Sequence, residues 1–269
     1  MPKLETPFTR LVGIEHPVMQ GGMHHVGLAP LAAAVSNAGG LGCITALTLP
    51  TPELLREEIR KCKKLTSKPF GVNITLLPAL TPPNYDAYVD VIIDEKIKVV
   101  ETAGNNPGKF IKRCKDAGII VIHKCVTIRH AKTAVKAGAD YLSIDGFECA
   151  GHPGSEDVGN MVLLAMACRD LGAPFLASGG IGTGIQLAAC LALGADGVNM
   201  GTRFMATVEA PIHHKIKQAL VDAEVTQTTL VLRSFNNTER VFLNATSKQA
   251  TEEEKLKPGG ALVVSLRLG

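Results

Sequence analysis

The chain has 269 residues, of which 46% are hydrophobic and 20% are charged. This composition is globular, and the length suits one large α/β domain as well as two ordinary ones. The net charge of +3 is too small to indicate nucleic-acid binding, and the seven cysteines form no CxxC pair, which favours reduced thiols. The chain starts without an apolar signal stretch, and no apolar run approaches the roughly 20 residues of a membrane span. We therefore expect a cytoplasmic protein that binds neither nucleic acid nor membrane.

Short apolar runs alternate with longer amphipathic stretches along the chain. The runs are short for helices and rich in Val, Ile and Phe, so they predict buried strands. The stretches between them predict helices, and several end in glycine, which readily adopts the left-handed conformation that stops a helix. In chain order the pattern predicts strand 16–20, helix 28–37, strand 41–46, helix 51–65, strand 70–77, helix 85–95, strand 99–103, helix 109–117, strand 119–125, helix 128–137, strand 141–145, helix 160–171, strand 175–178, helix 183–193, strand 197–200 and helix 211–223.

Eight strands, each followed by a helix, match the count of a closed (β/α)₈ barrel. The competing arrangement is an open doubly wound sheet, but the glycine spacing of residues 180–184 does not fit the dinucleotide fingerprint GxGxxG. We assign residues 1–245 to the barrel domain and 246–269 to a divergent C-terminal tail. Within the last part of the barrel domain, 228–232 is β-prone or helical without a clear period.

Two glycine-bearing turns follow the seventh and eighth predicted strands. They are Ser178-Gly179-Gly180 and Met200-Gly201-Thr202. The strand ends at this position of a barrel are the usual phosphate site, and glycine lets backbone N–H groups approach an anion closely. Glycines that only make turns are the alternative explanation. Two such turns at these strands favour the phosphate.

A long glycine-rich loop, 146–154, follows the sixth strand. Within it His152 lies between Gly151 and Pro153, and a histidine there can act as a general base near neutral pH. An ordinary loop histidine is the equal alternative. Cys149 and His152 could also ligate a metal, but without another ligand cluster the sequence does not indicate zinc.

Lys124 ends the fifth strand. A lysine that points into a barrel mouth is costly without an anion nearby, and a phosphate or a reduced flavin ring would supply one. The alternative is a lysine that extends to solvent. We expect Glu101 to be paired within the barrel and His130, on a helix, to be structural.

Together these motifs resemble those of the nitronate monooxygenase family, formerly called 2-nitropropane dioxygenases. The resemblance runs from about Pro17 to about Ala245, and the Gly-His-Pro-Gly loop combined with the Ser-Gly-Gly turn is highly specific. It rests on residues 19–23, 37–42, 69–73, 145–154, 177–181 and 199–203.

The resemblance implies a TIM barrel that binds FMN noncovalently at the C-terminal ends of its strands. It implies that Lys124 faces the flavin and that His152 is the catalytic histidine. The other implied cofactor-binding residues are Ser178, Gly179, Gly180, Gly201 and Thr202 at the phosphate, Gly22, Met23 and Thr75 along the ring or ribityl chain, and Ala150 and Gly151 at the border of the flavin.

The activity implied first is an FMN-dependent nitronate monooxygenase that oxidises alkyl nitronates with O₂, in which His152 takes the α-proton of a neutral nitroalkane. One bacterial branch, which residues 99–104 and 121–125 resemble especially, implies an NAD(P)H:quinone reductase instead. A third hypothesis is a flavin-binding protein with impaired catalysis, because relatives continue well beyond this chain's end and cover the barrel with extra helices. The enoyl-thioester reductases of fatty acid synthesis, which share the barrel, are a fourth. The partners are then a small-molecule substrate, nitronate or quinone, with O₂ or NAD(P)H, and the sequence allows a homodimer.

Overall fold

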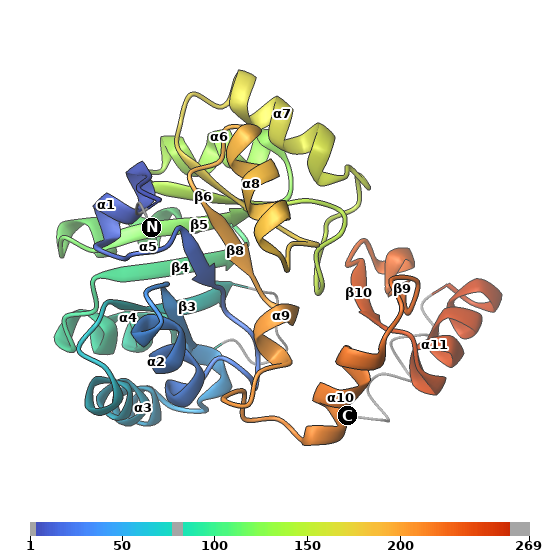
Figure 1. Ribbon diagram of the computed structural model, residues 1–269, viewed down its shortest axis with the longest axis horizontal. Coiled ribbons are helices and arrows are strands. Elements are labelled where there is room, and N and C mark those ends of the chain that lie inside the picture. The colour runs from blue at the N-terminus through green and yellow to red at the C-terminus, as the bar shows by residue number, and fades with distance from the viewer. Residues whose placement is uncertain (1–3, 77–82, 259–269) are drawn as a thin grey trace.

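Eight short parallel strands form the centre of the fold, each followed by a helix on the outside (Figure 1). The computed structural model describes residues 4–76 and 83–258. Strand neighbours follow the order β1-β8-β7-β6-β5-β4-β3-β2, and a parallel bridge between Met19 and Leu41 joins β1 to the start of β2. The sheet therefore closes on itself, which confirms the predicted (β/α)₈ barrel and excludes the open doubly wound sheet.

The element bounds agree closely with the predicted pattern. The last residue of the predicted strand 70–77 lies outside the described residues. The predicted helix 211–223 starts later, at His214, because the His213 side chain caps its first turn. The barrel elements are β1 Val18–Gln20, α2 Ala29–Asn37, β2 Gly42–Thr45, α3 Pro52–Leu65, β3 Phe70–Leu76, α4 Tyr85–Asp94, β4 Val99–Gly104, α5 Gly108–Asp116, β5 Ile120–Cys125, α6 Ile128–Lys136, β6 Tyr141–Asp145, α7 Asn160–Asp170, β7 Phe175–Ser178, α8 Gly184–Ala192 and β8 Val198–Met200.

Apolar side chains fill the lower half of the barrel. Because side chains alternate along a strand, every second residue points inward, and these form one buried cluster, while their neighbours pack against the helices. A short N-terminal helix, α1 (Pro7–Val12), closes the floor with Phe8, whose ring centroid lies 5.3 Å from that of Tyr141. The inward residues of the floor are Met19, Leu41, Cys43, Val99, Ile122, Tyr141 and Leu176. Polar chemistry is thus confined to the upper, C-terminal end of the strands.

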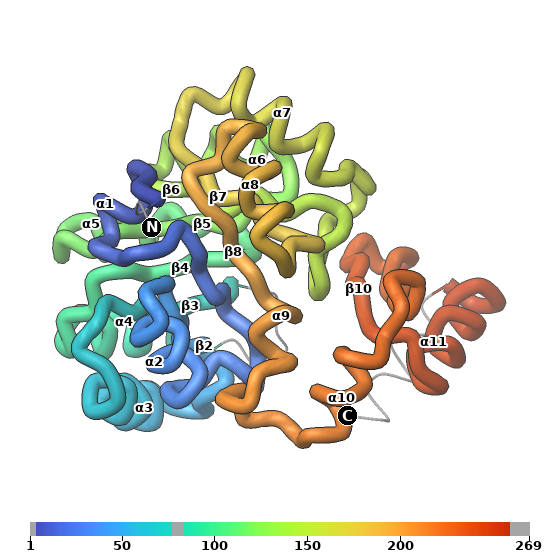
Figure 2. Tube along the Cα trace, in the orientation of Figure 1, coloured from blue at the N-terminus to red at the C-terminus, as the bar shows by residue number. Residues whose placement is uncertain are grey.

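A smaller unit follows the barrel and lies to its side (Figure 2). After α9 (Thr202–Met205) and α10 (His214–Asp222), strands β9 (Thr228–Val231) and β10 (Glu239–Phe242) form an antiparallel hairpin. Within the described residues the tail expected from position 246 begins as α11 (Ala245–Leu256), which packs on the hairpin through Ala250 and Val231. The division of the chain at residue 245 stays a prediction.

Glu95, at the C-terminal end of α4, is a buried carboxylate that serves as a stability probe. The side chain of Glu95 is 8% exposed and accepts hydrogen bonds from Arg56 Nη1, Arg60 Nε and Lys63 Nζ, at 3.3, 2.9 and 2.8 Å. Burial alone would raise the pKa of Glu95, but the bonds from the three cations outweigh it and lower the pKa below its ordinary value. Glu95 therefore stabilises the fold as a carboxylate.

Replacing Glu95 with glutamine is expected to lower the free energy of unfolding at pH 7 by about 2 kcal/mol, because charge-assisted hydrogen bonds are lost. A carboxyl whose folded pKa is lowered contributes above its unfolded pKa, near 4.5, and this contribution is lost as pH falls through the folded pKa. Urea unfolding should therefore separate the variant from the native chain at pH 7 and much less at about pH 3. Asp116→Asn, which removes an exposed pair with Lys112, is the control and should change little. An equal difference at both pH values would contradict this account.

Candidate active site

A fully buried carboxylate, that of Glu101 on β4, organises the polar layer above the apolar floor. Its Oε2 accepts hydrogen bonds from the backbone N–H of Gly22 at 2.8 Å and from Asn73 Nδ2 at 2.7 Å, and its Oε1 accepts from Asn199 Nδ2 at 2.7 Å. Asn73 lies on β3, Asn199 on β8, and Gly22 just after β1. One side chain thus ties together four strand ends, which agrees with the expectation that Glu101 pairs within the barrel.

The loop after β1 lies directly on these carboxamides. A Cβ atom on Gly21 would be 2.3 Å from Asn199 Oδ1, and one on Gly22 would be 2.1 Å from Asn73 Cγ. Real Cβ atoms essentially never come so close, so glycine is required at both positions for the loop to reach the barrel mouth. The hydrogen bonds of Glu101 to Asn73, Asn199 and Gly22 therefore fix the position of the Gly21-Gly22 loop above the strand ends.

Replacing Glu101 with glutamine is expected to lower the free energy of unfolding by about 3 kcal/mol, because its amide would direct hydrogen atoms at a neighbour that also donates. Denaturant unfolding measures this loss, with the exposed Glu57→Gln as the matched control. A loss below about 1 kcal/mol, the size of a surface effect, would mean that Glu101 does not hold the strand ends together.

Lys124 reaches the mouth from β5, and the protein itself supplies the anion that its burial requires. Its Nζ lies 3.2 Å from Asp145 Oδ2 at the end of β6, and the lysine side chain is 25% exposed. Burial alone would lower the pKa of Lys124, but the carboxylates of Asp145 and Glu101 raise it above its ordinary value, so the ammonium stays charged. We expected a phosphate or a reduced flavin ring to supply the anion that Lys124 needs, but Asp145 already supplies it. The charge of Lys124 is therefore no evidence for a flavin.

The two glycine turns lie side by side at the strand ends, because β7 pairs with β8 in parallel through Ser178 and Asn199. Gly179 and Gly180 both have left-handed backbones, with φ of +98° and +68°. Asn160 Nδ2 donates to the carbonyls of Ser178 and Gly179, at 3.0 and 2.6 Å, and Gln186 Nε2 donates to that of Gly180. The three carbonyls of the first turn are therefore all hydrogen-bonded within the protein.

The backbone N–H groups of the same turns are free to bind a ligand. Among residues 4–76 and 83–258, no acceptor bonds the N–H groups of Gly180, Gly201 or Thr202. Gly180 is left-handed, whereas Gly201, with φ of −120°, and Thr202 are two successive residues of the second turn. Unpaired backbone N–H groups that converge in this way form a typical anion-binding concavity. The donor set therefore fits a phosphate, which is the group that these turns were predicted to bind.

The loop that carries His152 packs directly against the first turn. The Gly146 N–H donates to the Ser178 carbonyl at 3.0 Å, and a Cβ on Gly179 would lie 2.9 Å from the Cys149 backbone nitrogen. His152 itself is exposed, and its ring has no hydrogen bond to any residue that the structure describes. The ring is thus available to a substrate. Burial raises the pKa of the Cys149 thiol to about 12, so Cys149 is not a thiolate nucleophile at neutral pH.

The remaining predicted cofactor contacts lie around the same mouth with most of their donors already used. The Met23 N–H donates to Thr45 Oγ1 at 2.8 Å, and Thr75 Oγ1 donates to Asn73 Oδ1 at 3.1 Å. Because the Gly22 N–H donates to Glu101 and the Met23 N–H to Thr45, these two residues could contact a ligand by packing but not through these N–H groups. Ala150 and Gly151 lie in the His152 loop, exposed and half-buried respectively. The roles of all these residues stay predictions.

His123, next to Lys124, faces the other way. It is buried between β5 and the helices, with its Nδ1 2.8 Å from Thr102 Oγ1, and burial lowers its pKa to about 4. It is therefore a neutral structural histidine. Asp145 and Asn160 also belong to the site, although we predicted no role for either from the sequence. Asp145 ends a predicted strand beside the glycine-rich loop, a signal that could have identified it.

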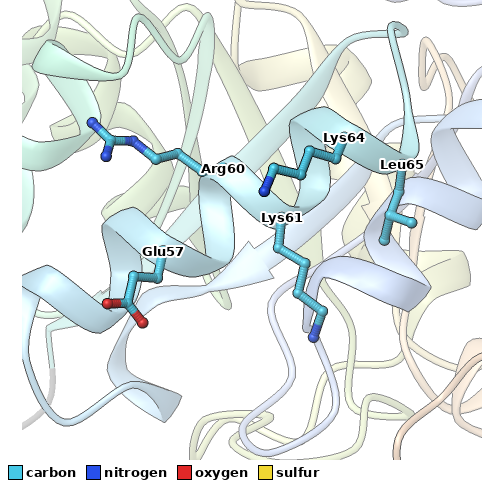
Figure 3. Close-up of a pocket in the computed structure, with 5 residues that line it drawn as sticks. All are labelled: Glu57, Arg60, Lys61, Lys64 and Leu65. Carbon is cyan, nitrogen blue, oxygen red and sulfur yellow. The ribbon is translucent and has the colours of Figure 1, made fainter.

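Pockets elsewhere on the surface do not carry this chemistry. A cavity of about 380 Å³ lies on the C-terminal half of α3, lined by Glu57, Arg60, Lys61, Lys64 and Leu65 (Figure 3). That half of α3 leads into β3 and so belongs to the opposite, N-terminal face of the barrel. Over the described ranges no helix is long and apolar enough to cross a bilayer, and no three potential metal ligands cluster.

Comparison with known proteins identifies the family. The sequence profile of the family described as "Nitronate monooxygenase" matches residues 5–262, which extends beyond 17–245 at both ends. A protein of Rhodococcus jostii named "(3aS,4S,5R,7aS)-5-hydroxy-7a-methyl-1-oxo-octahydro-1H-indene-4-carboxyl-CoA dehydrogenase" is 38% identical over 91% of this chain and 67% of its own length. A "Probable nitronate monooxygenase" of Staphylococcus haemolyticus is 30% identical over 82% of this chain and 73% of its own. The chain thus spans about two thirds to three quarters of these relatives.

Solved structures agree with this assignment. FabK from Thermotoga maritima superimposes with a TM-score of 0.90 at 39% identity, covering 98% of this chain and 84% of that one. Nitroalkane oxidase from Streptomyces ansochromogenes gives a TM-score of 0.77 at 31% identity, covering 88% and 79%. With a family match over almost the whole described chain and a shared barrel, this chain belongs to the nitronate monooxygenase family of oxidoreductases.

Proposed function

We propose that this chain is an FMN-dependent oxidoreductase that acts on a carbon next to an electron-withdrawing group, with His152 as the base. The observation that supports the proposal is the direct contact of Gly146 and Cys149, in the His152 loop, with the Ser178–Gly180 turn, because this turn is the one proposed to bind the phosphate. FMN, when bound, supplies the two-electron acceptor or donor that the amino acids lack.

The residues at the barrel mouth would have different roles. The N–H groups of Gly180, Gly201 and Thr202 would bind the flavin phosphate, with Ser178 and Gly179 shaping the first turn. Lys124, held charged by Asp145, would stabilise negative charge on the ring, whose edges Gly22, Met23, Thr75, Ala150 and Gly151 would border. His152 would take a proton from the substrate carbon and return it to solvent, to which it is exposed.

Two substrate classes share this chemistry. A thioester carbonyl and a nitro group each acidify the adjacent C–H bond, so a histidine base suits both. The 38% identity to a protein whose name ends in "carboxyl-CoA dehydrogenase" favours a CoA thioester. The family match and the lower identity to a protein named as a nitronate monooxygenase support alkyl nitronate oxidation with O₂ as the second candidate. NAD(P)H:quinone reduction and a catalytically impaired flavin protein stay predictions.

Anaerobic rapid mixing tests the proposal. The protein loaded with FMN is mixed separately with NAD(P)H, propyl-2-nitronate and a saturated acyl-CoA, and flavin absorbance is followed. Bleaching by acyl-CoA, or by NAD(P)H with reoxidation by an enoyl-CoA, would support the thioester class, whereas bleaching by nitronate alone would support the second candidate. Bleaching by NAD(P)H with reoxidation only by quinone would support the reductase alternative. A flavin that reacts with none of them would overturn the proposal.

A further inference from the structure

The hairpin of the C-terminal unit pairs with the loop that carries His152. The Gly151 N–H donates to the Arg240 carbonyl at 3.1 Å, and the Arg240 N–H donates to the Gly151 carbonyl at 2.6 Å, which makes an antiparallel bridge between β10 and the residue just before His152. Figure 1 shows the hairpin beside the loop that follows β6. The barrel loop and the hairpin are therefore joined at backbone level.

The Arg240 side chain reaches a second point of the same loop. Its Nη2 and Nε donate to the Phe147 carbonyl at 2.9 and 3.3 Å, and its guanidinium carbon lies 4.6 Å from the centroid of the Phe147 ring. A third donor, Nη1, bonds Thr228 Oγ1 on β9 at 3.0 Å. Arg240 thus binds both ends of segment 147–151, while its bond to Thr228 holds it within its own hairpin. A planar guanidinium can donate several hydrogen bonds and stack on an aromatic ring at the same time.

The backbone contact with Arg240 lies at Gly151, a left-handed residue directly before His152. Its φ is +76°, and a Cβ at this position would meet no atom within 4 Å, so no side chain packs over this turn. His152 has no side-chain bond to a described residue, so only its backbone determines where its ring lies. Within the part of the chain that the structure describes, the two bonds to Arg240 are the backbone hydrogen bonds that Gly151 makes.

We propose that Arg240 is the positioning residue of the candidate base, so that the β9–β10 hairpin is part of the active site rather than an appendage of the barrel. Arg240 acts through Phe147 and Gly151 to fix the direction in which His152 leaves the loop. The role of His152 as a base rests on the proposed function, but the ordering of residues 146–154 by Arg240 does not.

The test compares Arg240→Ala and Arg240→Lys with Arg233→Ala, in the full chain. Arg233 also bonds the barrel from the C-terminal unit, by two bonds to Asp157 at 3.1 and 2.6 Å. Both side chains are about 40% exposed, and Asp157 lies outside residues 146–154. Hydrogen exchange of residues 146–154, measured by mass spectrometry, gives a readout independent of activity. Oxidation of a neutral nitroalkane relative to its nitronate gives a second readout, because only the neutral compound needs a base.

We expect exchange of 146–154 to rise at least about tenfold in Arg240→Ala, less in the lysine variant, and little in Arg233→Ala. The ratio of neutral to nitronate turnover should fall in the same order. Equal exchange in the native chain and Arg240→Ala, or equal increases in Arg240→Ala and Arg233→Ala, would overturn the inference. Faster exchange with no turnover of either compound by the native chain would support Arg240's ordering role while showing that nitroalkanes are not substrates.

Discussion

His152→Asn is expected to slow oxidation of a neutral nitroalkane by about 100- to 10,000-fold, the usual range for losing a positioned general base. Oxidation of the corresponding nitronate should fall far less, because a nitronate has already lost the α-proton. For an acyl-CoA substrate, the same variant should slow the exchange of α-deuterium with water by a similar factor. Steady-state rates with the paired substrates, and mass spectrometry of the recovered thioester, measure the two effects.

His130→Asn is the matched control for this variant. His130 is an exposed histidine on α6, outside the barrel mouth, so its replacement should leave both rates unchanged. Equal losses with the neutral compound and the nitronate would contradict a base role for His152. They would instead indicate that the ring contributes to binding or to closing the site.

Gly179→Ala is expected to weaken FMN binding by about tenfold. Position 179 has a φ of +98°, and the added Cβ would meet the Cys149 backbone nitrogen at 2.9 Å, so the turn must move. Displacing the Gly180 N–H from the phosphate costs about 1.5 kcal/mol for one charge-assisted bond, which amounts to the stated factor. Equilibrium titration of the apoprotein, followed by quenching of flavin fluorescence, measures the affinity.

Gly172→Ala controls for backbone strain. Gly172 has a φ of +63° and open space around it, and it lies between α7 and β7, where it precedes the strand rather than following it. Its replacement should cost about 1–2 kcal/mol of stability, as any left-handed alanine does, without changing FMN affinity. A variant at Gly179 that binds FMN as tightly as the Gly172 variant would contradict the assignment of the phosphate to this turn.

The barrel and the location of its site follow from local sequence patterns. Strands such as β6 and β7 are runs of buried residues flanked by glycine stops, and the closed ring follows from their number and their alternation with helices. Because parallel strands end on one face, the motifs after β6, β7 and β8 had to lie together. The left-handed Gly179 and Gly180 agree with the free N–H groups expected of that turn.

The partners of the site residues could not be derived in this way. Lys124 forms an ion pair with Asp145, and Arg240 bonds Phe147, which is 93 positions away in the sequence. Neither pairing leaves a periodic signal in the sequence. Glu101 sits inside a strand, where only the closed barrel brings Asn73 and Asn199 to its two oxygens. Residues 228–232, most of which form β9, were ambiguous, and β10 was not predicted. Both strands have only four residues and are largely half-buried, so their hydrophobic pattern is weak.

The central claim is that the Ser178–Gly180 and Gly201-Thr202 turns bind the phosphate of FMN. Parallel titration of the apoprotein with FMN and with riboflavin, which lacks only the phosphate, tests it most directly. If the turns bind the phosphate, FMN should bind at least about 100-fold more tightly than riboflavin, from two charge-assisted hydrogen bonds. Equal affinity for the two flavins, or no affinity for either, would contradict the account.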